Sequence, residues 1–280
     1  MRCAWEEYLR LLPPWMRSEV DRIGKAELQE LRLRNGQPPK MIGVSNVHLI
    51  ERAVASDDLT YVINAASQYS PWSVGTMAKG YITANGGHRI GICGDCVVQN
   101  GIMTGIRSVT SLCLRVSRDF PGMAVTTAKQ KGSILIIGPP GSGKTTLLRD
   151  LIRQKSNTSN NSIAVVDERA EIFPSINGRY CYDCGANTDI MTGCNKQEGI
   201  DMLLRTMGPC CIAIDEITQP KDCMSLLHAG WSGVTLIATA HATNKSDLYA
   251  REIYQPLVHN HLFDILITLQ LDKSWKLERI

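Results

Sequence analysis

The sequence predicts a two-domain α/β protein, with a small mixed α/β domain over residues 1–122, a linker over residues 123–132, and a domain with a helix-covered parallel sheet over residues 133–280. Short β-type runs separated by glycines fill much of the first part, which is typical of an antiparallel sheet with tight turns. From Ser133 onward, apolar runs alternate with helical stretches, which is typical of a parallel sheet covered on both faces. Between them lies the turn signal Phe120-Pro121-Gly122, where we place the boundary.

The first domain is expected to mix helices and strands from its start. Apolar residues between positions 5 and 12 have the spacing of a short amphipathic helix, which Pro13-Pro14 would end. The alternation over residues 30–34 predicts a strand. Ser56-Asp57-Asp58 predicts the cap of a helix that runs from about Leu59 to Tyr69.

Glycines punctuate the rest of the first domain. The runs between them are expected to be short strands, at 81–83, 88–92, 96–98 and 111–116. Four arginines stand out in this block: Arg89, Arg107, Arg115 and Arg118. From the pattern alone, we expect them to be solvated charges on a sheet face.

Five apolar runs are expected to form the parallel sheet of the second domain, at 134–137, 163–166, 211–214, 234–238 and 265–269. The first four are followed by residues that can do chemistry. Ligands of open parallel sheets lie beyond the carboxyl ends of the strands, so we expect these ends to converge on one crevice.

The stretch after the first of these strands fits the phosphate-binding pattern G-x-x-x-x-G-K-[ST] and leads into a predicted helix. Its glycines allow successive backbone N–H groups to point at one anion, and the helix dipole adds positive potential there. Lys144 is expected to reach the β- and γ-phosphates, and the Thr145 hydroxyl to bind Mg²⁺. The residues expected to bind the polyphosphate are Gly138, Pro139, Pro140, Gly141, Ser142, Gly143, Lys144, Thr145 and Thr146.

Acidic residues follow two of the other predicted strands. Asp215 is expected to hold Mg²⁺, mostly through water, and Glu216 to orient or deprotonate an attacking water. Glu168 follows the strand at 163–166 and competes with Glu216 for that role, and the sequence does not decide between them. His241 follows the fourth strand, where it is a candidate sensor of the γ-phosphate, the alternative being a structural histidine. Arg205 faces either a nucleotide, a neighbouring subunit or solvent.

Composition narrows the classes of function. A hydrophobic fraction of 44% and a charged fraction of 20% are typical of a globular protein, and the net charge of +3 gives no strong field for nucleic acid. No uninterrupted apolar stretch approaches the length of a membrane span, and acidic residues occupy the start, where a signal peptide would be apolar. We therefore expect the protein to stay in the compartment where it is made. The pairs Cys93/Cys96 and Cys181/Cys184 have C-x-x-C spacing, but they are far apart, so we expect reduced thiols rather than a zinc site.

Several motifs together resemble the stage III sporulation protein AA family. The most specific is Gly86-Gly87-His88-Arg89 with its continuation to Gly94. The others are Gly80-Tyr81-Ile82-Thr83, residues 112–116, the loop 138–145, residues 165–171 and Thr239-Ala240-His241. The resemblance covers roughly residues 20–270. That family is similar to the secretion and type IV pilus ATPases, hexameric motors in which an N-terminal domain covers the nucleotide on a RecA-like, AAA+ ATPase domain.

The resemblance implies a role for each matching position. Residues 138–145 correspond to the Walker A loop, Asp215-Glu216 to the Walker B pair, residues 167–171 to the acidic box and His241 to the histidine box. Arg89 and Arg115 become candidate catalytic residues that reach the phosphates from the N-terminal domain.

Two stretches depart from the family pattern. Residues 173–194 are rich in Cys and Tyr, and Thr218-Gln219-Pro220 stands where a glycine is expected. Both departures leave the local loop geometry open, and neither removes a catalytic group.

Our hypothesis is an ATPase that uses ATP and Mg²⁺ and converts domain closure into work on a membrane-bound partner. The resemblance implies a homo-oligomer, expected to be a hexamer, in the mother-cell cytoplasm of an endospore-forming bacterium. It would be peripherally associated with membrane proteins of a sporulation channel, which it energises. The alternatives are a nucleic-acid-remodelling ATPase, disfavoured by the near-neutral charge, and an ATP-binding assembly scaffold with little turnover.

Overall fold

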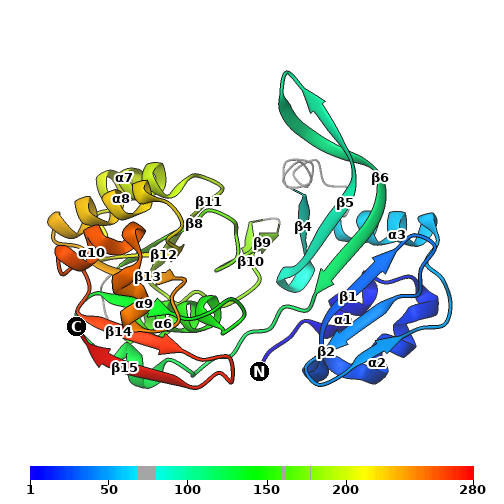
Figure 1. The fold of residues 1–280 in the computed structure, drawn as a ribbon, viewed down its shortest axis with the longest axis horizontal. Coiled ribbons are helices and arrows are strands. Elements are labelled where there is room, and N and C mark those ends of the chain that lie inside the picture. The colour runs from blue at the N-terminus through cyan, green and yellow to red at the C-terminus, as the bar shows by residue number, and fades with distance from the viewer. Residues whose placement is uncertain (68–79, 159–161, 177) are drawn as a thin grey trace. The chain divides into compact units, whose positions relative to one another are not determined.

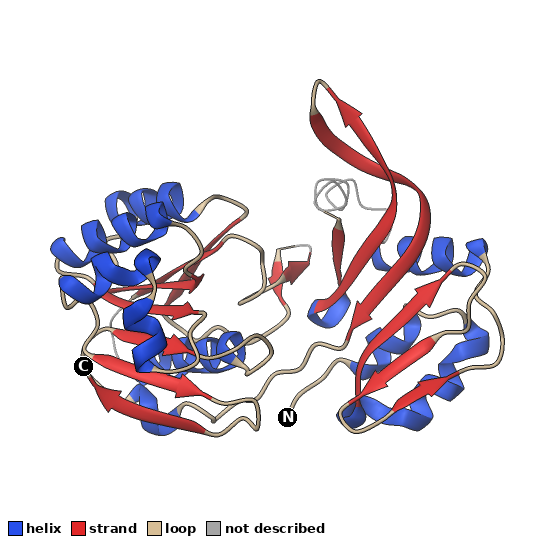
Figure 2. Cartoon of the chain, in the orientation of Figure 1, coloured by secondary structure: helices blue, strands red, loops and turns tan. Residues whose placement is uncertain are grey.

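The computed structural model describes residues 1–67, 80–158, 162–176 and 178–280. Contacts within the chain define two units (Figure 1). Unit 1 consists of Met1–Asp119 and Ser175–Tyr182, and unit 2 consists of Phe120–Pro174 and Asp183–Ile280. Each unit combines helices with a sheet (Figure 2), so the α/β fold class is confirmed. In the described part of the chain, no helix has both the length and the hydropathy needed to cross a membrane.

Unit 1 is built on a six-stranded sheet in which every neighbouring pair is antiparallel. Its strand order is β3-β2-β1-β6-β5-β4. The strands are β1 (Leu28–Arg34), β2 (Lys40–Gly43), β3 (Val47–Leu49), β4 (Tyr81–Ala84), β5 (His88–Gln99) and β6 (Ile102–Arg115). The predicted antiparallel sheet and the predicted strand at 30–34 are both confirmed.

Strands β5 and β6 are longer than the sequence pattern indicated. The runs at 88–92 and 96–98 were expected to be separate strands, whereas β5 is continuous through Gly94, with a bulge between Cys93 and Asp95. A Cβ at Gly94 would lie 2.8 Å from the Arg107 carbonyl oxygen, so this glycine allows the two strands to approach rather than ending one.

The helical elements described in unit 1 are α1 (Trp5–Arg10), α2 (Pro14–Glu27), α3 (Ser56–Ser67) and the short 3-10 turn η1 (Asn85–Gly87). Pro14 occupies the first turn of α2, where its missing N–H has no partner to lose. Tyr8, Met16 and Val20 are buried in one core with strand residues such as Leu31 and Leu114. The helix predicted from Leu59 begins three residues earlier, and positions 68 and 69 of that prediction lie outside the described residues.

Unit 2 is built on a seven-stranded sheet of order β11-β8-β12-β13-β7-β14-β15. Its strands are β7 (Ile134–Ile137), β8 (Ile163–Asp167), β11 (Thr188–Thr192), β12 (Cys211–Glu216), β13 (Thr235–Ala240), β14 (Ile265–Leu269) and β15 (Trp275–Arg279). All pairings are parallel except that of β14 with β15. The five predicted strands are therefore confirmed, and the two edge strands β11 and β15 were not predicted.

Helices cover the unit 2 sheet: α5 (Val125–Ala128), α6 (Lys144–Thr158), α7 (Lys196–Thr206), α8 (Pro220–Trp231), α9 (Lys245–Ala250), η2 (Glu252–Tyr254) and α10 (Gln255–His259). Ile200 of α7 and Leu226 of α8 share a buried cluster with Leu135 and Ile137 of β7. Ile134 and Ile136 point the other way because side chains alternate along a strand, and they are also fully buried. Both faces of the sheet are therefore covered, as a parallel sheet requires.

One hairpin of the second half of the chain belongs to unit 1. It is formed by β9 (Ser175–Ile176) and β10 (Arg179–Tyr180). The Tyr182 hydroxyl that follows it is hydrogen-bonded to the Ser117 hydroxyl and lies 3.5 Å from the Gly86 carbonyl oxygen. The domain limits proposed from the sequence assign these residues to the second domain.

Candidate active site

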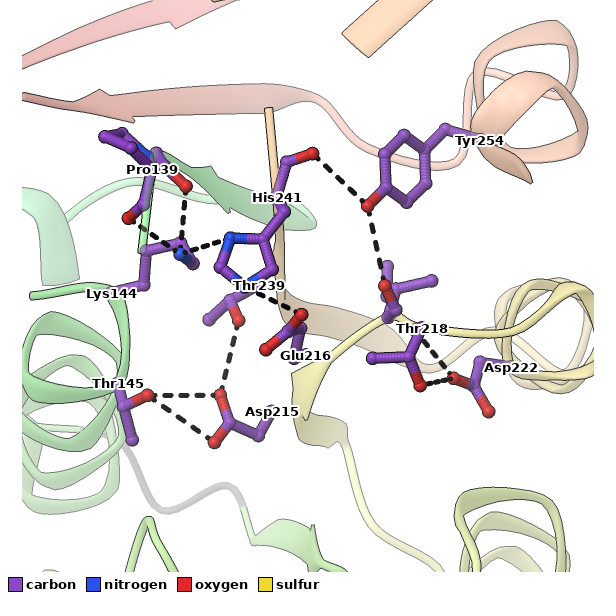
Figure 3. A network of polar contacts seen from close by, with 12 residues as sticks. Pro139, Lys144, Thr145, Asp215, Glu216, Thr218, Asp222, Thr239, His241 and Tyr254 are labelled. Atoms are coloured by element: carbon purple, nitrogen blue, oxygen red, sulfur yellow. Dashed lines mark hydrogen bonds and ion pairs between the residues drawn. The ribbon is translucent and has the colours of Figure 1, made fainter. Parts of the chain in front are cut away.

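The candidate site lies at the carboxyl ends of β8, β12, β13 and β7, which are consecutive parallel strands of the unit 2 sheet. Their following residues converge, as the sequence indicated. Figure 3 shows two sets of polar contacts there: Lys144 with His241 and Glu216, and Asp215 with the hydroxyls of Thr145 and Thr239.

The loop that matches the phosphate-binding pattern has a backbone that favours glycine at Gly138 and Gly143. Gly143 has a φ of +103°, which L side chains rarely adopt. A Cβ at Gly138 would lie 2.6 Å from the Ser142 hydroxyl and 2.9 Å from the Leu269 carbonyl oxygen. The loop ends at Lys144, the first residue of α6, so the positive end of that helix dipole faces the loop.

Other candidate residues of the loop differ in exposure. Pro140 and Gly141 are exposed, Thr146 is half-buried in the first turn of α6, and Ser142 is buried. Among the described residues, the Ser142 hydroxyl is one of two buried side-chain polar atoms with no hydrogen-bond partner. A buried hydroxyl without a partner is unfavourable unless a ligand satisfies it. The loop therefore fits a polyphosphate in backbone shape, helix dipole and unsatisfied donor.

Lys144 holds its ammonium group within the loop. Its Nζ lies 2.9 Å from the Gly138 carbonyl oxygen, 3.1 Å from that of Pro139 and 3.0 Å from His241 Nδ1 (Figure 3). Burial lowers the pKa of Lys144, and the carboxylates of Glu216 and Asp215 oppose this effect. A phosphate that takes the ammonium must replace these three acceptors.

The Asp215 carboxylate is the centre of the candidate magnesium site. Its Oδ1 accepts hydrogen bonds of 3.3 Å from both Thr145 Oγ1 and Thr239 Oγ1. Burial and the neighbouring Asp167 raise the pKa of Asp215 to about 6. Mg²⁺ prefers oxygen ligands and commonly keeps several waters, with one or two carboxylates and substrate phosphates. One carboxylate beside one threonine hydroxyl fits that requirement.

His241 connects Lys144 to Glu216. An ammonium group can only donate, so His241 Nδ1 must accept from Lys144, and the ring proton lies on Nε2. This Nε2 is 2.8 Å from Glu216 Oε1. The hydroxyl of the buried Tyr254 lies 3.5 Å from the His241 carbonyl oxygen. The loop lysine and the second acidic residue of β12 are thus joined through one imidazole ring.

Glu168 lies in the same pocket as Asp215 and Glu216. The preceding Asp167 is buried and has a different task, because its carboxylate accepts from the backbone N–H groups of Glu171, Ile172 and Phe173 at 2.8–3.0 Å. These bonds fix a loop in which Ala170 has a φ of +51°. The structure therefore brings both candidate water-orienting glutamates together, and Asp167 shapes the loop that carries one of them.

Sequence reasoning missed Lys196. Its Nζ lies 2.7 Å from Glu168 Oε2 and 3.6 Å from Asp222 Oδ2, and its side chain is 7% exposed. No sequence motif used above includes a lysine this far along the chain from the loop of residues 138–145. One sequence signal could have identified it. Lys196 directly follows Asn195, the cap residue of α7, and a cation is unfavourable at the N-terminus of a helix unless another interaction compensates.

The turn after β12 forms without the expected glycine. Asp222 Oδ2 accepts from the backbone N–H groups of Thr218 and Gln219, at 2.9 and 3.1 Å. The Gln219 side chain in turn caps α8. A capping box replaces the flexibility that glycine would supply.

The two candidate arginines belong to unit 1. Arg89 and Arg115 are cross-strand partners on β5 and β6. The Arg89 guanidinium stacks over the Tyr81 ring at 4.1 Å, and Arg115 is mostly exposed, 3.7 Å from a Glu30 carboxylate oxygen. Their contact with a phosphate stays a prediction. Arg205 is exposed in the last turn of α7.

One sequence match establishes the family of this chain. The sequence profile described as "Sporulation stage III, protein AA" matches residues 6–277. The chain belongs to this family. It is 33% identical to the stage III sporulation protein AA of Bacillus subtilis (strain 168), over 96% of this chain and 92% of that protein. The resemblance inferred from the motifs is confirmed.

Similar folds occur in the ATPase DotB and in the pilus retraction motor PilT. The ATPase DotB of Legionella pneumophila matches with a TM-score of 0.59 and 16% identity, over 96% of this chain and 80% of DotB. The pilus retraction motor PilT matches with a TM-score of 0.60 and 14% identity, over 90% of this chain and 76% of PilT. The RecA-like fold class is thereby confirmed.

The cysteines form no disulfide in the structure, and all ten are free thiols. Within the described ranges, no group of three or more His, Cys, Asp or Glu side chains is arranged to hold a metal ion. A magnesium ion at Asp215 would therefore depend on the Thr145 hydroxyl, water and phosphate oxygens for its other ligands.

Proposed function

We propose that this protein hydrolyses ATP at the carboxyl edge of the unit 2 sheet. The observation that carries the proposal is that Lys144, Thr145, Asp215, Glu216 and His241 meet around a glycine-shaped loop at a helix N-terminus, in the contacts Lys144–His241–Glu216 and Thr145–Asp215. Each of these groups has a use in phosphoryl transfer, which depends on positioning and on charge stabilisation. The presence of ADP in the similarly folded PilT supports nucleotide binding here.

The loop residues divide the work of holding the nucleotide. The backbone N–H groups of residues 138–145 and the Ser142 hydroxyl would bind the phosphates, with the Lys144 ammonium on the β- and γ-phosphates. Thr145 and Asp215 would hold Mg²⁺, which supplies charge neutralisation on the phosphate oxygens.

The residues opposite the loop would act on the water. Glu216 or Glu168 would orient it for in-line attack on the γ-phosphate, since both carboxylates lie in one pocket with Asp215. When Lys144 turns to the phosphates, His241 loses its ammonium donor at Nδ1 while it still binds Glu216. Through this change in its hydrogen bonds, His241 would couple phosphate binding in the loop to the position of Glu216. Arg89 and Arg115 are proposed to add positive charge from unit 1.

Family membership supports the biological setting that we propose. Membership in the stage III sporulation protein AA family and the fold shared with DotB and PilT support a motor that energises a sporulation channel. We propose a homo-oligomer, a hexamer by analogy with secretion ATPases, in the mother-cell cytoplasm. Membrane proteins of the channel would be its partners.

Single-turnover hydrolysis tests this function and assigns the water-orienting residue. Wild type, Glu216→Gln and Glu168→Gln are mixed in excess over ATP, with Mg²⁺ or with EDTA, and phosphate release is followed. We expect Mg²⁺-dependent release by the wild type and a loss of at least about 100-fold in the variant that removes the water-orienting carboxylate. ATP binding should be retained in both variants. Wild-type protein that binds ATP without releasing phosphate would refute the proposal.

A further inference from the structure

We infer that Lys196 is a positioning residue for hydrolysis, which holds the Glu168 carboxylate in the pocket beside Asp215 and Glu216. This inference rests on the proposed ATPase function. It depends on the ion pair of 2.7 Å between Lys196 Nζ and Glu168 Oε2. Glu168 remains 37% exposed, so this carboxylate is held by the lysine and still faces the pocket.

The place of Lys196 in α7 is unfavourable by local rules. Lys196 is the first residue of the helix, directly after the cap residue Asn195, so its positive charge is close to the positive end of the helix dipole. It is also buried, which penalises an ammonium group unless it is paired. Residues that violate local preferences concentrate at functional sites, because another requirement overrides the local one.

The partners of Lys196 connect the two acidic strand ends. Glu168 directly follows β8, and Asp222 fastens the turn after β12 through the backbone of Thr218. Lys196 lies 3.6 Å from Asp222 Oδ2, so it bridges the loop of one candidate base to the turn that follows the other. The Asp222 side chain is 4% exposed and already accepts hydrogen bonds from the backbone of the capping turn. Of the two partners of Lys196, only Glu168 is therefore able to contact the substrate.

Charge explains why Glu168 needs such a partner. The pocket is lined by the carboxylates of Asp167, Glu168, Glu171, Asp215 and Glu216 and by two cations, Arg169 and Lys196. Carboxylates that line one partly buried pocket repel one another strongly. Without Lys196, the Glu168 side chain would turn toward solvent or toward the magnesium site. With it, the carboxylate stays available to a water molecule.

The test compares Lys196→Met and Lys196→Arg with the control Lys221→Met, which removes an exposed lysine of α8. Single-turnover rate, ATP affinity and thermal midpoint are measured for each, with Lys196→Gln used if the Met variant does not fold. We expect Lys196→Met to lower the rate about 10- to 100-fold with ATP affinity changed less than about twofold, the size usual for a side chain that orients a catalytic group. Lys196→Arg should recover most of the rate, and Lys221→Met should match the wild type.

A double variant separates positioning from a purely structural role. In the Glu168→Gln background, Lys196→Met should lower the rate no further, because the two residues act as one unit. A wild-type rate in Lys196→Met or Lys196→Gln, or equal and independent losses in the double variant, would overturn the inference while hydrolysis itself stands. Absence of turnover in both the wild type and Lys221→Met would overturn the ATPase proposal and this inference with it.

Discussion

His88 in unit 1 and His241 in unit 2 have the same side chain in opposite surroundings. His88 is fully buried, its Nε2 lies 2.9 Å from the Ala4 carbonyl oxygen, and its Nδ1 accepts from the Ser117 backbone N–H at 3.1 Å. His241 is 32% exposed and joins Lys144 to Glu216. One histidine has only backbone partners in these contacts, and the other has charged partners, of which the Lys144 ammonium could turn to a bound phosphate.

Other polar residues of the two units also differ in the kind of partner that they contact. In unit 1, partly buried side chains form isolated hydrogen-bonded pairs, such as Trp5 Nε1 with Asp21 Oδ1 at 2.7 Å and Trp15 Nε1 with Asp58 Oδ1 at 2.8 Å. In unit 2, charged groups of the site contact one another at the strand ends, Lys144 with Glu216 through His241, and Lys196 with Glu168. We propose that charged partners that a ligand can replace, rather than burial or residue type, distinguish the candidate functional cluster.

The largest effect that this comparison predicts is the loss of hydrolysis in Lys144→Ala. The variant removes the ammonium group that the Gly138 and Pro139 carbonyl oxygens and His241 Nδ1 hold, so transition-state charge is left without its main side-chain donor. We expect a rate at least about 1,000-fold lower in a phosphate-release assay. The exposed Lys131→Ala serves as the control and should hydrolyse ATP at the wild-type rate. Residual activity near that of the control would show that the network is structural.

The next effect is on stability, in Asp167→Ala. Three backbone N–H groups lose their acceptor in a buried loop, so we expect the free energy of unfolding to fall by about 2–4 kcal/mol in a urea titration. The exposed Asp57→Ala in unit 1 should fall by less than about 1 kcal/mol. Equal losses in the two variants would mean that Asp167 does not organise this loop.

Replacing each of the two histidines by glutamine tests the comparison directly. His241→Gln should lower the hydrolysis rate about tenfold with little change in thermal midpoint, because it loses a link between Lys144 and Glu216. His88→Gln should lower the thermal midpoint and keep the activity of the folded fraction, because it disrupts two backbone hydrogen bonds in a core. The reverse pattern would contradict the functional assignment of His241.

The smallest effect is a pH dependence of stability that originates in unit 1. Burial lowers the pKa of His88 below its usual range. The unfolded chain therefore binds more protons than the folded one as the pH falls below about 6.5, and stability decreases there. The contribution of His88 is fully present above that pH and is lost as the pH falls through the folded pKa. Thermal midpoints from pH 8 to 5 should decrease for the wild type and less for His88→Gln; equal slopes would refute this origin.

Local pattern predicted the phosphate loop, the five central strands and the residues at their ends. Fully apolar β-branched runs and a complete loop motif each determine structure within a few residues. The edge strand β15 was missed because Trp275-Lys276-Leu277-Glu278-Arg279 lies at the sheet edge and carries charge, so it lacks a buried-strand pattern. Lys196 was missed for another reason. Its partners Glu168 and Asp222 lie on other elements, and only the folded sheet brings them together.

The central claim is that the network at the strand ends performs Mg²⁺-dependent ATP hydrolysis in an assembled motor. Steady-state turnover measured against protein concentration, alongside molar mass from light scattering, tests this most directly. The account predicts turnover that requires Mg²⁺ and rises per subunit as the mass rises to that of a closed oligomer. Nucleotide binding and assembly without turnover at any concentration would contradict it and would favour an ATP-binding scaffold.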